Sequence, residues 1–367
     1  MSFVHTKQSQ VIDILKCVLP ILVVAIHTSH SAELDFHNGL EPFLRILIVK
    51  IGGIAVPCFF VISGYLFFIK LQEWNWNDWG KKIKKRARTL LIPFLLWIII
   101  DFVAKYLWGV MKSEIDGFSL FSFKTFFLDS GGLRMFWDRP LVEYNNSLLG
   151  YLVDSSKPID GPLWYVRDLM VMVLFAPLVW KMLKFTRYYA LIALCVIYLF
   201  FIGFPFVLVS PTALFFFSFG AAFSISGKDY LEVFRRTRFL SYSLSVILLA
   251  LSFMIDGPVW GKLVPQFFVV VSVVALFNLV SDLYDKGLRP VKLLTDSSFF
   301  IYASHAVLIT EISNFILWRT LPITAEWMLV LKVFLRPAVA VGICLLIYVV
   351  MKKVCPKTLA LLTGGRG

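Results

Sequence analysis

Stretches of mainly apolar residues, most of them long enough to cross the hydrocarbon core of a membrane, recur along the whole chain. About 20 such residues form a membrane-spanning helix, which satisfies its own backbone hydrogen bonds where water is absent. The chain is also too apolar for an ordinary soluble domain of 367 residues, with 59% hydrophobic residues and a mean hydropathy of +0.80. We therefore predict an all-α integral membrane protein, a bundle of about ten transmembrane helices. The runs lie near residues 10–30, 44–69, 89–109, 163–180, 188–202, 212–226, 239–254, 263–281, 297–318 and 328–351.

The segments between the runs alternate between strongly basic and neutral or acidic. With the N-terminus placed inside, the inner segments carry 22 Lys and Arg and the outer segments carry 8. This bias predicts that both termini are cytoplasmic. The net charge of +13 is concentrated in these inner segments, so we expect membrane lipids, and not nucleic acid, as partners.

The chain reads as one membrane domain, residues 1–367, without an internal repeat or a low-complexity linker. Its one long connection is an outward-facing loop at about 110–162, with aromatic residues gathered between Phe121 and Phe127. Loops of this length are usually functional or disordered, and the aromatic content argues against disorder. Two interpretations stay open: a glycan acceptor docks on the exposed rings, or the loop forms an interfacial helix that covers the bundle.

The five cysteines lie within or at the ends of the apolar runs and show no Cys-x-x-Cys spacing. A structural zinc site would require such spacing, so no metal is predicted. We interpret the cysteines as small apolar packing residues.

Lys16 and His27 lie eleven residues apart in the first apolar run. In a helix this spacing is about three turns, so the two side chains share nearly one face and are about 16 Å apart along the axis. A cation near one membrane surface and a base deep inside indicate a long ligand held between them, which requires a cavity that joins the two residues. Taken singly, Lys16 is also explained as an interfacial anchor and His27 as a hydrogen-bonded structural residue. The shared face, with His30 one turn further on, favours the functional interpretation.

A carboxylate in the ninth run is the predicted assistant of His27. Counting inward from the cytoplasmic end brings Glu311 to within about one turn of the depth of His27, where it can orient or recharge the imidazole. His305 lies six residues before Glu311, so these two side chains point in different directions and are not expected to pair. His305 is equally explained as a core histidine bonded to a neighbouring backbone carbonyl.

Two further groups fall near the depth of Lys16 or at its end of the membrane. Ser63 and Tyr65, in the second run, are candidate ligands for the molecule that Lys16 holds. Arg86 and Arg88 lie at the cytoplasmic mouth of the third run, where guanidinium groups can hold phosphate in a bidentate manner. Close helix packing explains the first group as well, and ordinary topology signals explain the second.

Charged residues inside the apolar runs are costly unless they face a partner or water. Asp101 and Lys105, four residues apart on one helix, are expected to neutralise each other. Lys332 and Arg336 lie near the outer end of the last run and are expected to snorkel to the membrane surface.

Five short motifs, in this order along the chain, resemble those of the membrane acyltransferase-3 family. The first is the pair Lys16 and His27, a basic residue and a histidine separated by ten positions. The resemblance spans nearly the whole chain, and five motifs in order argue against coincidence. The other four are Val56–Tyr65, Arg86–Arg88 with Ile92-Pro93-Phe94 after it, Gly161–Arg167 and Ile301–His305.

The resemblance implies transfer of an acyl group, most commonly acetyl, from cytoplasmic acyl-coenzyme A to a hydroxyl of a cell-surface or lipid-linked glycan. It implies a multi-pass protein of the bacterial cytoplasmic (inner) membrane. Many relatives carry a Glu-Arg-Pro-like element after the last helix, whereas Lys352–Pro356 here contains no glutamate, which leaves the assisting carboxylate open. The implied site has His27 as general base or nucleophile with Glu311 assisting, donor contacts from Lys16, Arg86, Arg88, Ser63 and Tyr65, and substrate binding or support from His30, Trp164, Arg167 and His305.

A transporter or flippase that moves a lipid-linked saccharide without acyl chemistry is the main alternative, because buried charges and a large outer loop also suit a translocation path. The two halves of the chain show no repeat, which disfavours many transporter architectures. A membrane scaffold whose buried charges are structural is a third interpretation. The sequence leaves the oligomeric state open, a homo-oligomer included.

Overall fold

The computed structural model describes residues 6–29, 39–69, 71, 73–115, 122–137, 157–186, 188–201, 209–321 and 326–365. Within these ranges the regular structure is helical and contains no β-strand, and each of the ten apolar runs coincides with a helix. The prediction of an all-α protein is therefore confirmed.

Six of the described helical segments are long and apolar enough to cross a membrane. A seventh is formed if η4–α7 (Gly161–Leu174) and α8 (Ala176–Thr186), which meet at a bend of 65°, count as one span. The protein is therefore a multi-pass membrane protein. The six are α1 (Lys7–Thr28), α2–α3 (Leu40–Gly52 and Ala55–Phe68), α4–η2–α5 (Trp76–Arg86, Ala87–Leu91 and Ile92–Ile115), α13 (Trp260–Asp285), α14–η5–α15 (Lys292–Ser304, His305–Ile309 and Thr310–Thr320) and α16 (Glu326–Val354).

Three apolar helices are shorter than a full span. They are α9 (Tyr188–Phe201), α10 (Pro211–Ser226) and α12 (Arg238–Met254). The count of about ten spans thus stays a prediction for these three, as does the cytoplasmic placement of both termini. The remaining described helices are α6 (Phe123–Asp129), η3 (Gly132–Phe136), α11 (Tyr230–Arg235) and α17 (Pro356–Thr363).

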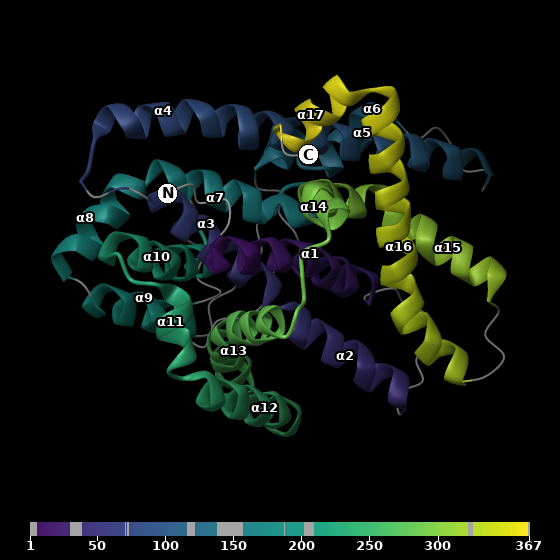
Figure 1. Cartoon of the computed structure of the whole chain (residues 1–367). Coiled ribbons are helices and arrows are strands. Elements are labelled where there is room, and N and C mark those ends of the chain that lie inside the picture. The colour runs from purple at the N-terminus through teal and green to yellow at the C-terminus, as the bar shows by residue number, and fades with distance from the viewer. Residues whose placement is uncertain are drawn as a thin grey trace.

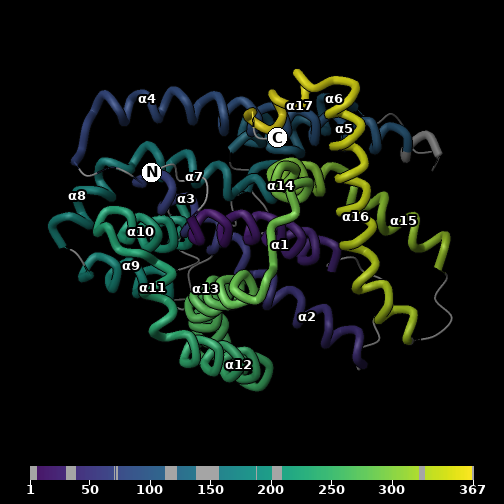
Figure 2. The backbone as a smooth tube through the Cα atoms, viewed as in Figure 1, coloured from purple at the N-terminus to yellow at the C-terminus, as the bar shows by residue number. Residues whose placement is uncertain are grey.

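The first helix occupies the middle of the bundle, with α2, α3, α13, α14 and α16 packed around it (Figure 1). Thr6 caps this helix by accepting a hydrogen bond from the Ser9 amide. Figure 2 shows that α1 lies beside α14 and α16, which come from the far end of the chain. The sequence therefore brings its first and ninth apolar runs together, and these two runs carry the predicted reactive residues.

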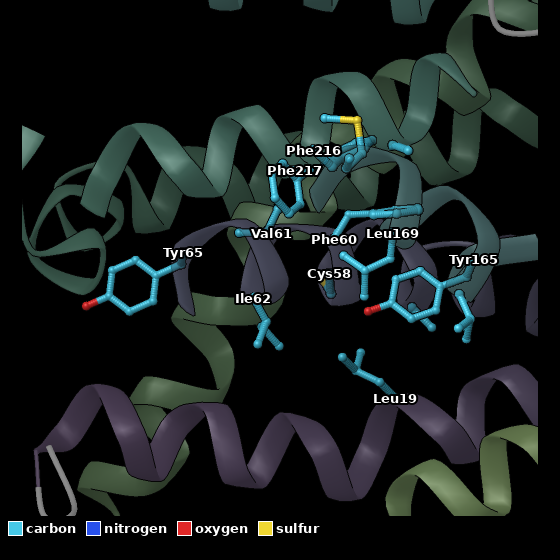
Figure 3. Packing of buried hydrophobic residues seen from close by; sticks show 14 of the residues in the cluster. Leu19, Cys58, Phe60, Val61, Ile62, Tyr65, Tyr165, Leu169, Phe216 and Phe217 are labelled. Carbon is cyan, nitrogen blue, oxygen red and sulfur yellow. The ribbon is translucent and has the colours of Figure 1, made fainter. Parts of the chain in front are cut away.

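Helices α3 and α10 make the closest approach in the bundle. A Cβ atom placed on Gly64 would overlap the backbone carbonyl of Phe217, and one placed on Gly220 would overlap that of Val61. Small residues allow such contact in membranes, where helix association depends on close packing. Figure 3 shows the apolar layer that results, with Val61 facing the α10 residues.

The predictions for the charged residues inside the spans had different outcomes. The Asp101–Lys105 pair is confirmed, with Nζ and Oδ2 2.7 Å apart. The prediction that Lys332 and Arg336 snorkel to the surface is wrong, because their residues are only 1% and 4% exposed. Their helix, α16, packs against α1, α2 and α15, and both residues are buried inside the bundle.

The long predicted outer loop is described only in part, and residues 116–121 and 138–156 lie outside the described ranges. Of the aromatic piece, residues 123–127 lie in α6, and η3 follows this helix. The end of the loop enters the bundle: Ile159 and Asp160 are buried, and the Ile159 amide donates to Met135 O at 2.9 Å. Whether the loop docks a glycan stays a prediction.

Candidate active site

A cavity of about 440 Å³ lies between α1, α3, α7, α14 and the α4–η2 junction. Two cations, Lys16 and Arg86, line it together with the hydroxyls of Ser63 and Thr295. Asp296 contributes one carboxylate, and the remaining lining is mainly apolar and aromatic. A polar molecule with an anionic end and an apolar arm matches this arrangement.

Lys16 forms an ion pair with Asp13 of the same helix, with Nζ and Oδ1 2.9 Å apart. Both side chains are about one-third exposed, at 36% and 29%, so the ammonium group remains accessible from the cavity. The pairing also fits the interpretation of Lys16 as an anchor. Its place in the lining, opposite Arg86, adds a ligand-binding surface to that role.

The structure separates the two arginines that the sequence grouped. Arg86 is partly buried and lines the cavity, whereas Arg88 is exposed and lies outside the described lining. Residues two apart on a helix do not face the same way, which is the physical reason for the difference.

Ser63 and Tyr65 are separated in the same manner. The Ser63 hydroxyl lies 2.9 Å from the Tyr165 hydroxyl at the wall of the cavity. The Tyr65 hydroxyl instead donates to Gln8 Oε1 at 2.7 Å, beside a second cavity of about 530 Å³. In Figure 3, Tyr65 and Tyr165 lie at opposite ends of the packed layer, and Tyr65 points away from it. Tyr65 is therefore not placed with the predicted donor ligands.

Three aromatic rings close one end of the main cavity. Phe59 lies with its ring centroid 5.6 Å from that of Tyr165 and 6.0 Å from that of Tyr302. The Tyr302 hydroxyl donates a hydrogen bond to Pro162 O, which ties α14 to the segment that returns from the outer loop. This aromatic wall, made of Phe59, Tyr165 and Tyr302, leads directly to the histidines.

His27 and His305 lie against each other beyond the aromatic wall. Their ring centroids are 5.1 Å apart, and the ring of Tyr302 lies 6.3 Å from that of His305. His27 is exposed, whereas His305 is fully buried. The Nδ1 atom of His305 lies 2.8 Å from Tyr302 O and 3.2 Å from Ile301 O, as expected of a core histidine bonded to backbone carbonyls.

The predicted cavity between Lys16 and His27 is present only in part. Lys16 lines it, but neither histidine does. Tyr302, which also lines it, lies with its ring centroid 6.3 Å from that of His305. Sequence spacing fixed the relation of Lys16 to His27 along α1 but carried no information on these rings from other helices.

Glu311 lies in the first turn of α15, beyond a break in the ninth run. Val307 and Leu308 are not helical there, and Leu308 has a φ of 60°. The Glu311 side chain is exposed, and within the described ranges no hydrogen bond or ion pair joins it to His27. Its role as assistant stays a prediction, whereas the His305 ring packs against that of His27. His30 lies outside the described residues.

Trp164 and Arg167 have structural contacts. Trp164 packs on Phe60 with ring centroids 6.1 Å apart. Arg167 donates from Nε and an Nη atom to Asp168 Oδ1 at 3.0 and 2.8 Å, and also to Trp137 O at 2.8 Å. The second Asp168 oxygen accepts from the Ser210 amide at 2.9 Å. This buried pair links α7 to η3 and to the start of α10.

Sequence reasoning did not select the members of the aromatic wall as site residues. Tyr165 and Tyr302 lie inside the motifs Gly161–Arg167 and Ile301–His305, and Phe59 lies inside Val56–Tyr65. A signal was therefore present, because three of the five motifs that resemble the family supply one ring each. Nothing in the spacing showed that the three rings meet.

A multi-pass helical protein with a cationic cavity near a pair of histidines has the features of a membrane transferase. The family model described as an acyltransferase domain, the acyltransferase-3 family, matches residues 10–349, so the chain belongs to this family and is an acyltransferase. The chain is 24% identical over 368 residues to the succinoglycan biosynthesis protein ExoH of Rhizobium meliloti (strain 1021). The aligned region covers 97% of this chain and 92% of that protein. No solved structure matches the chain.

Proposed function

We propose that the protein transfers an acyl group from acyl-coenzyme A to a hydroxyl of a polysaccharide, or of its lipid-linked precursor, in a bacterial cytoplasmic membrane. The observation that carries this proposal is the cavity lined by Lys16, Arg86 and Tyr302, because the ring of Tyr302 lies 6.3 Å from that of His305, which in turn lies 5.1 Å from that of His27. The similarity to a protein named for succinoglycan biosynthesis supports a polysaccharide acceptor.

The donor is proposed to bind with its phosphates at Lys16 and Arg86. Guanidinium and ammonium groups are the usual protein ligands of phosphate, and two of them from separate helices favour a ligand with more than one anionic group. The mainly apolar remainder of the lining suits the pantetheine arm, with the thioester directed toward the aromatic wall. Acetyl is the acyl group that we expect.

His27 is proposed to act as general base. One imidazole nitrogen takes the proton from the acceptor hydroxyl while the hydroxyl oxygen attacks the thioester carbonyl. The carbon–sulfur bond then breaks, and the leaving thiolate takes the same proton back from the imidazolium. Because His27 is exposed and Lys16 faces the cavity, acceptor and donor approach the imidazole from different sides.

The experiment uses the purified full chain in lipid vesicles with acetyl-coenzyme A labelled in its acetyl group and a succinoglycan-type polysaccharide or its lipid-linked repeat as acceptor. We expect thiol release that depends on the acceptor, together with label on the glycan. His27→Ala should lower both to a small residual rate, whereas His5→Ala, a matched loss of a histidine, should not.

The outcomes separate the mechanisms. Label bound to the protein in the absence of acceptor would make His27 a nucleophile and not a base. Glycan movement across the vesicle without thiol release would contradict the proposal and support transport. Near-normal turnover by His27→Ala would remove His27 from the catalytic role.

A further inference from the structure

The protonation state of the His305 ring follows from its neighbours. Its Nδ1 atom lies within hydrogen-bond distance of two backbone carbonyls, those of Ile301 and Tyr302. Carbonyl oxygens only accept hydrogen bonds, so Nδ1 must carry the proton. In the neutral ring, Nε2 is therefore a bare acceptor.

That acceptor is buried and lacks a hydrogen-bond partner among the described residues. His305 is 0% exposed, so water does not readily satisfy Nε2. Buried polar atoms without partners are uncommon, and in native proteins they often mark a functional position. The nearest ring with an N–H group to offer is His27.

The two rings have a spacing that suits a direct bond. A hydrogen bond of about 3 Å between ring nitrogens, with the radii of two imidazoles added, places the centroids roughly 5 Å apart. The observed value is 5.1 Å, with the ring planes inclined at 47°. This spacing suits an N–H of His27 that donates to Nε2.

The geometry points to His305 as the positioning residue of His27. Its Nε2 accepts a hydrogen bond from the protonated ring nitrogen of His27, which leaves the other His27 nitrogen deprotonated and directed away from His305, toward the reacting hydroxyl. Base and orienting partner linked in this way are a recurrent arrangement in acyl transfer. The catalytic consequence of this inference rests on the proposed function. The hydrogen bond between the two rings does not depend on that function.

The local fold fixes His305 for this role. The helix breaks at Val307 and Leu308, immediately after the histidine. Both the amide and the hydroxyl of Thr310 bond to the His305 carbonyl, the hydroxyl at 2.9 Å, so the broken turn still holds the residue. Irregular backbone at membrane depth is tolerated where protein or a cavity surrounds it, and it commonly marks a functional site.

The kinetic test compares three variants of the full chain in vesicles. His305→Phe keeps an aromatic ring but removes the acceptor, so kcat should fall about 100-fold, while KM for acetyl-coenzyme A changes by less than about twofold. His305→Gln restores an acceptor oxygen and should recover roughly tenfold of that loss. Ser304→Ala, a buried neighbour whose hydroxyl faces Cys344, is the structural control and should stay within about twofold of the native kcat.

A double-variant cycle distinguishes a positioning role from a general loss of packing. In the His27→Ala background, His305→Phe should cause no further loss, because the residue acts through His27. An independent second loss, or equal losses in His305→Phe and Ser304→Ala, would overturn the inference.

A measurement without turnover separates this inference from the proposed function. The chain has five histidines, so its nitrogen resonances can be assigned with single variants of protein labelled with ¹⁵N-histidine. We expect an unprotonated Nε2 on His305 and a coupling across the hydrogen bond to His27, lost in His305→Phe. A protonated Nε2 would refute the pair even in an active enzyme. An intact pair in a protein that transfers no acetyl would instead refute the proposed donor and acceptor.

Discussion

Tyr165 and Tyr302 meet edge to face, with ring centroids 5.7 Å apart and ring planes inclined at 80°, at the end of the cavity nearest to His305. Together with Phe59 they form the wall between the binding cavity and the histidine pair. The acyl group of a donor held at Lys16 and Arg86 would lie at this wall. The size of its rings should therefore set which acyl groups reach His27.

Phe59→Ala removes the ring of the wall that has no hydroxyl to anchor it. The space left should shift the preference of the enzyme from acetyl toward longer acyl groups by about tenfold in relative kcat/KM, since one or two methylenes are worth about 1–3 kcal/mol in a fitted pocket. Competition between acetyl- and butyryl-coenzyme A measures the shift. Leu66→Ala, in the same lining but about 10 Å further along α3, is the control and should leave the preference unchanged.

Arg86 and Arg88 provide a matched pair for the donor site. Arg86→Gln removes a charge that faces the cavity, so KM for acetyl-coenzyme A should rise at least tenfold, as expected from the loss of a charged hydrogen bond worth about 1.5–3 kcal/mol. Arg88→Gln removes an exposed charge outside the lining and should change KM by less than about twofold. Steady-state kinetics in vesicles checks both. Equal effects of the two substitutions would show that the basic cluster acts only through its overall charge.

The contact between α3 and α10 predicts a stability difference between two glycines. Gly64→Ala would force a methyl group into the Phe217 carbonyl and should destabilise the protein by about 1–3 kcal/mol or more, because neither backbone can move freely. Gly342→Ala, on α16, meets no atom within 4 Å and should be neutral or stabilising by up to about 1 kcal/mol. Thermal unfolding in detergent compares them. An unchanged midpoint for Gly64→Ala would contradict the described packing.

Asp160 predicts a pH dependence of stability. Burial and the nearby Asp101 raise the pKa of its carboxyl well above the ordinary value of 3.8, although Lys105 opposes the shift. The folded protein therefore holds a proton that the unfolded chain releases, and stability should fall as pH rises from about 3.8 to the folded pKa and then level off.

The corresponding variant is Asp160→Asn, which cannot ionise. It should be more stable than the native protein at neutral pH, and this advantage should shrink as the pH is lowered toward 4, where the native carboxyl is protonated. Unfolding midpoints measured across this range test the claim. Glu232→Gln, at an exposed carboxylate on α11, is the control and should follow the native pH dependence. A constant difference at all pH values would show that Asp160 is ionised in the fold.

The features that sequence predicted well depend on composition or on spacing within one helix. The apolar runs predicted the helices, and the four-residue spacing predicted the Asp101–Lys105 pair. Counting residues along the helices predicted that Ser63 lies near the depth of Lys16, and both line the cavity. Properties that depend on the rotation of a helix or on its neighbours could not be predicted from the sequence. Tyr65 turned away from the cavity although it lies only two residues from Ser63.

The contact of His27 with His305 was also not predictable, because it depends on how α1 and α14 pack against each other. Beyond His305 the helix breaks at Val307 and Leu308. Depth counting assumes a straight helix, and the break changes the direction in which every later residue points. That assumption favoured Glu311 as the neighbour of His27. In the structure, His305 on the near side of the break occupies that position, and Glu311 follows it on a separate helix.

The central claim is that the cavity delivers the acyl end of a coenzyme A thioester to His27. Bromoacetyl-coenzyme A carries an alkylating group at that end, and peptide mass analysis identifies the residue that it modifies. We predict an adduct on His27 that acetyl-coenzyme A prevents and that Arg86→Gln reduces strongly. Modification confined to cysteines or to residues remote from the aromatic wall, with His27 unmodified, would contradict the account.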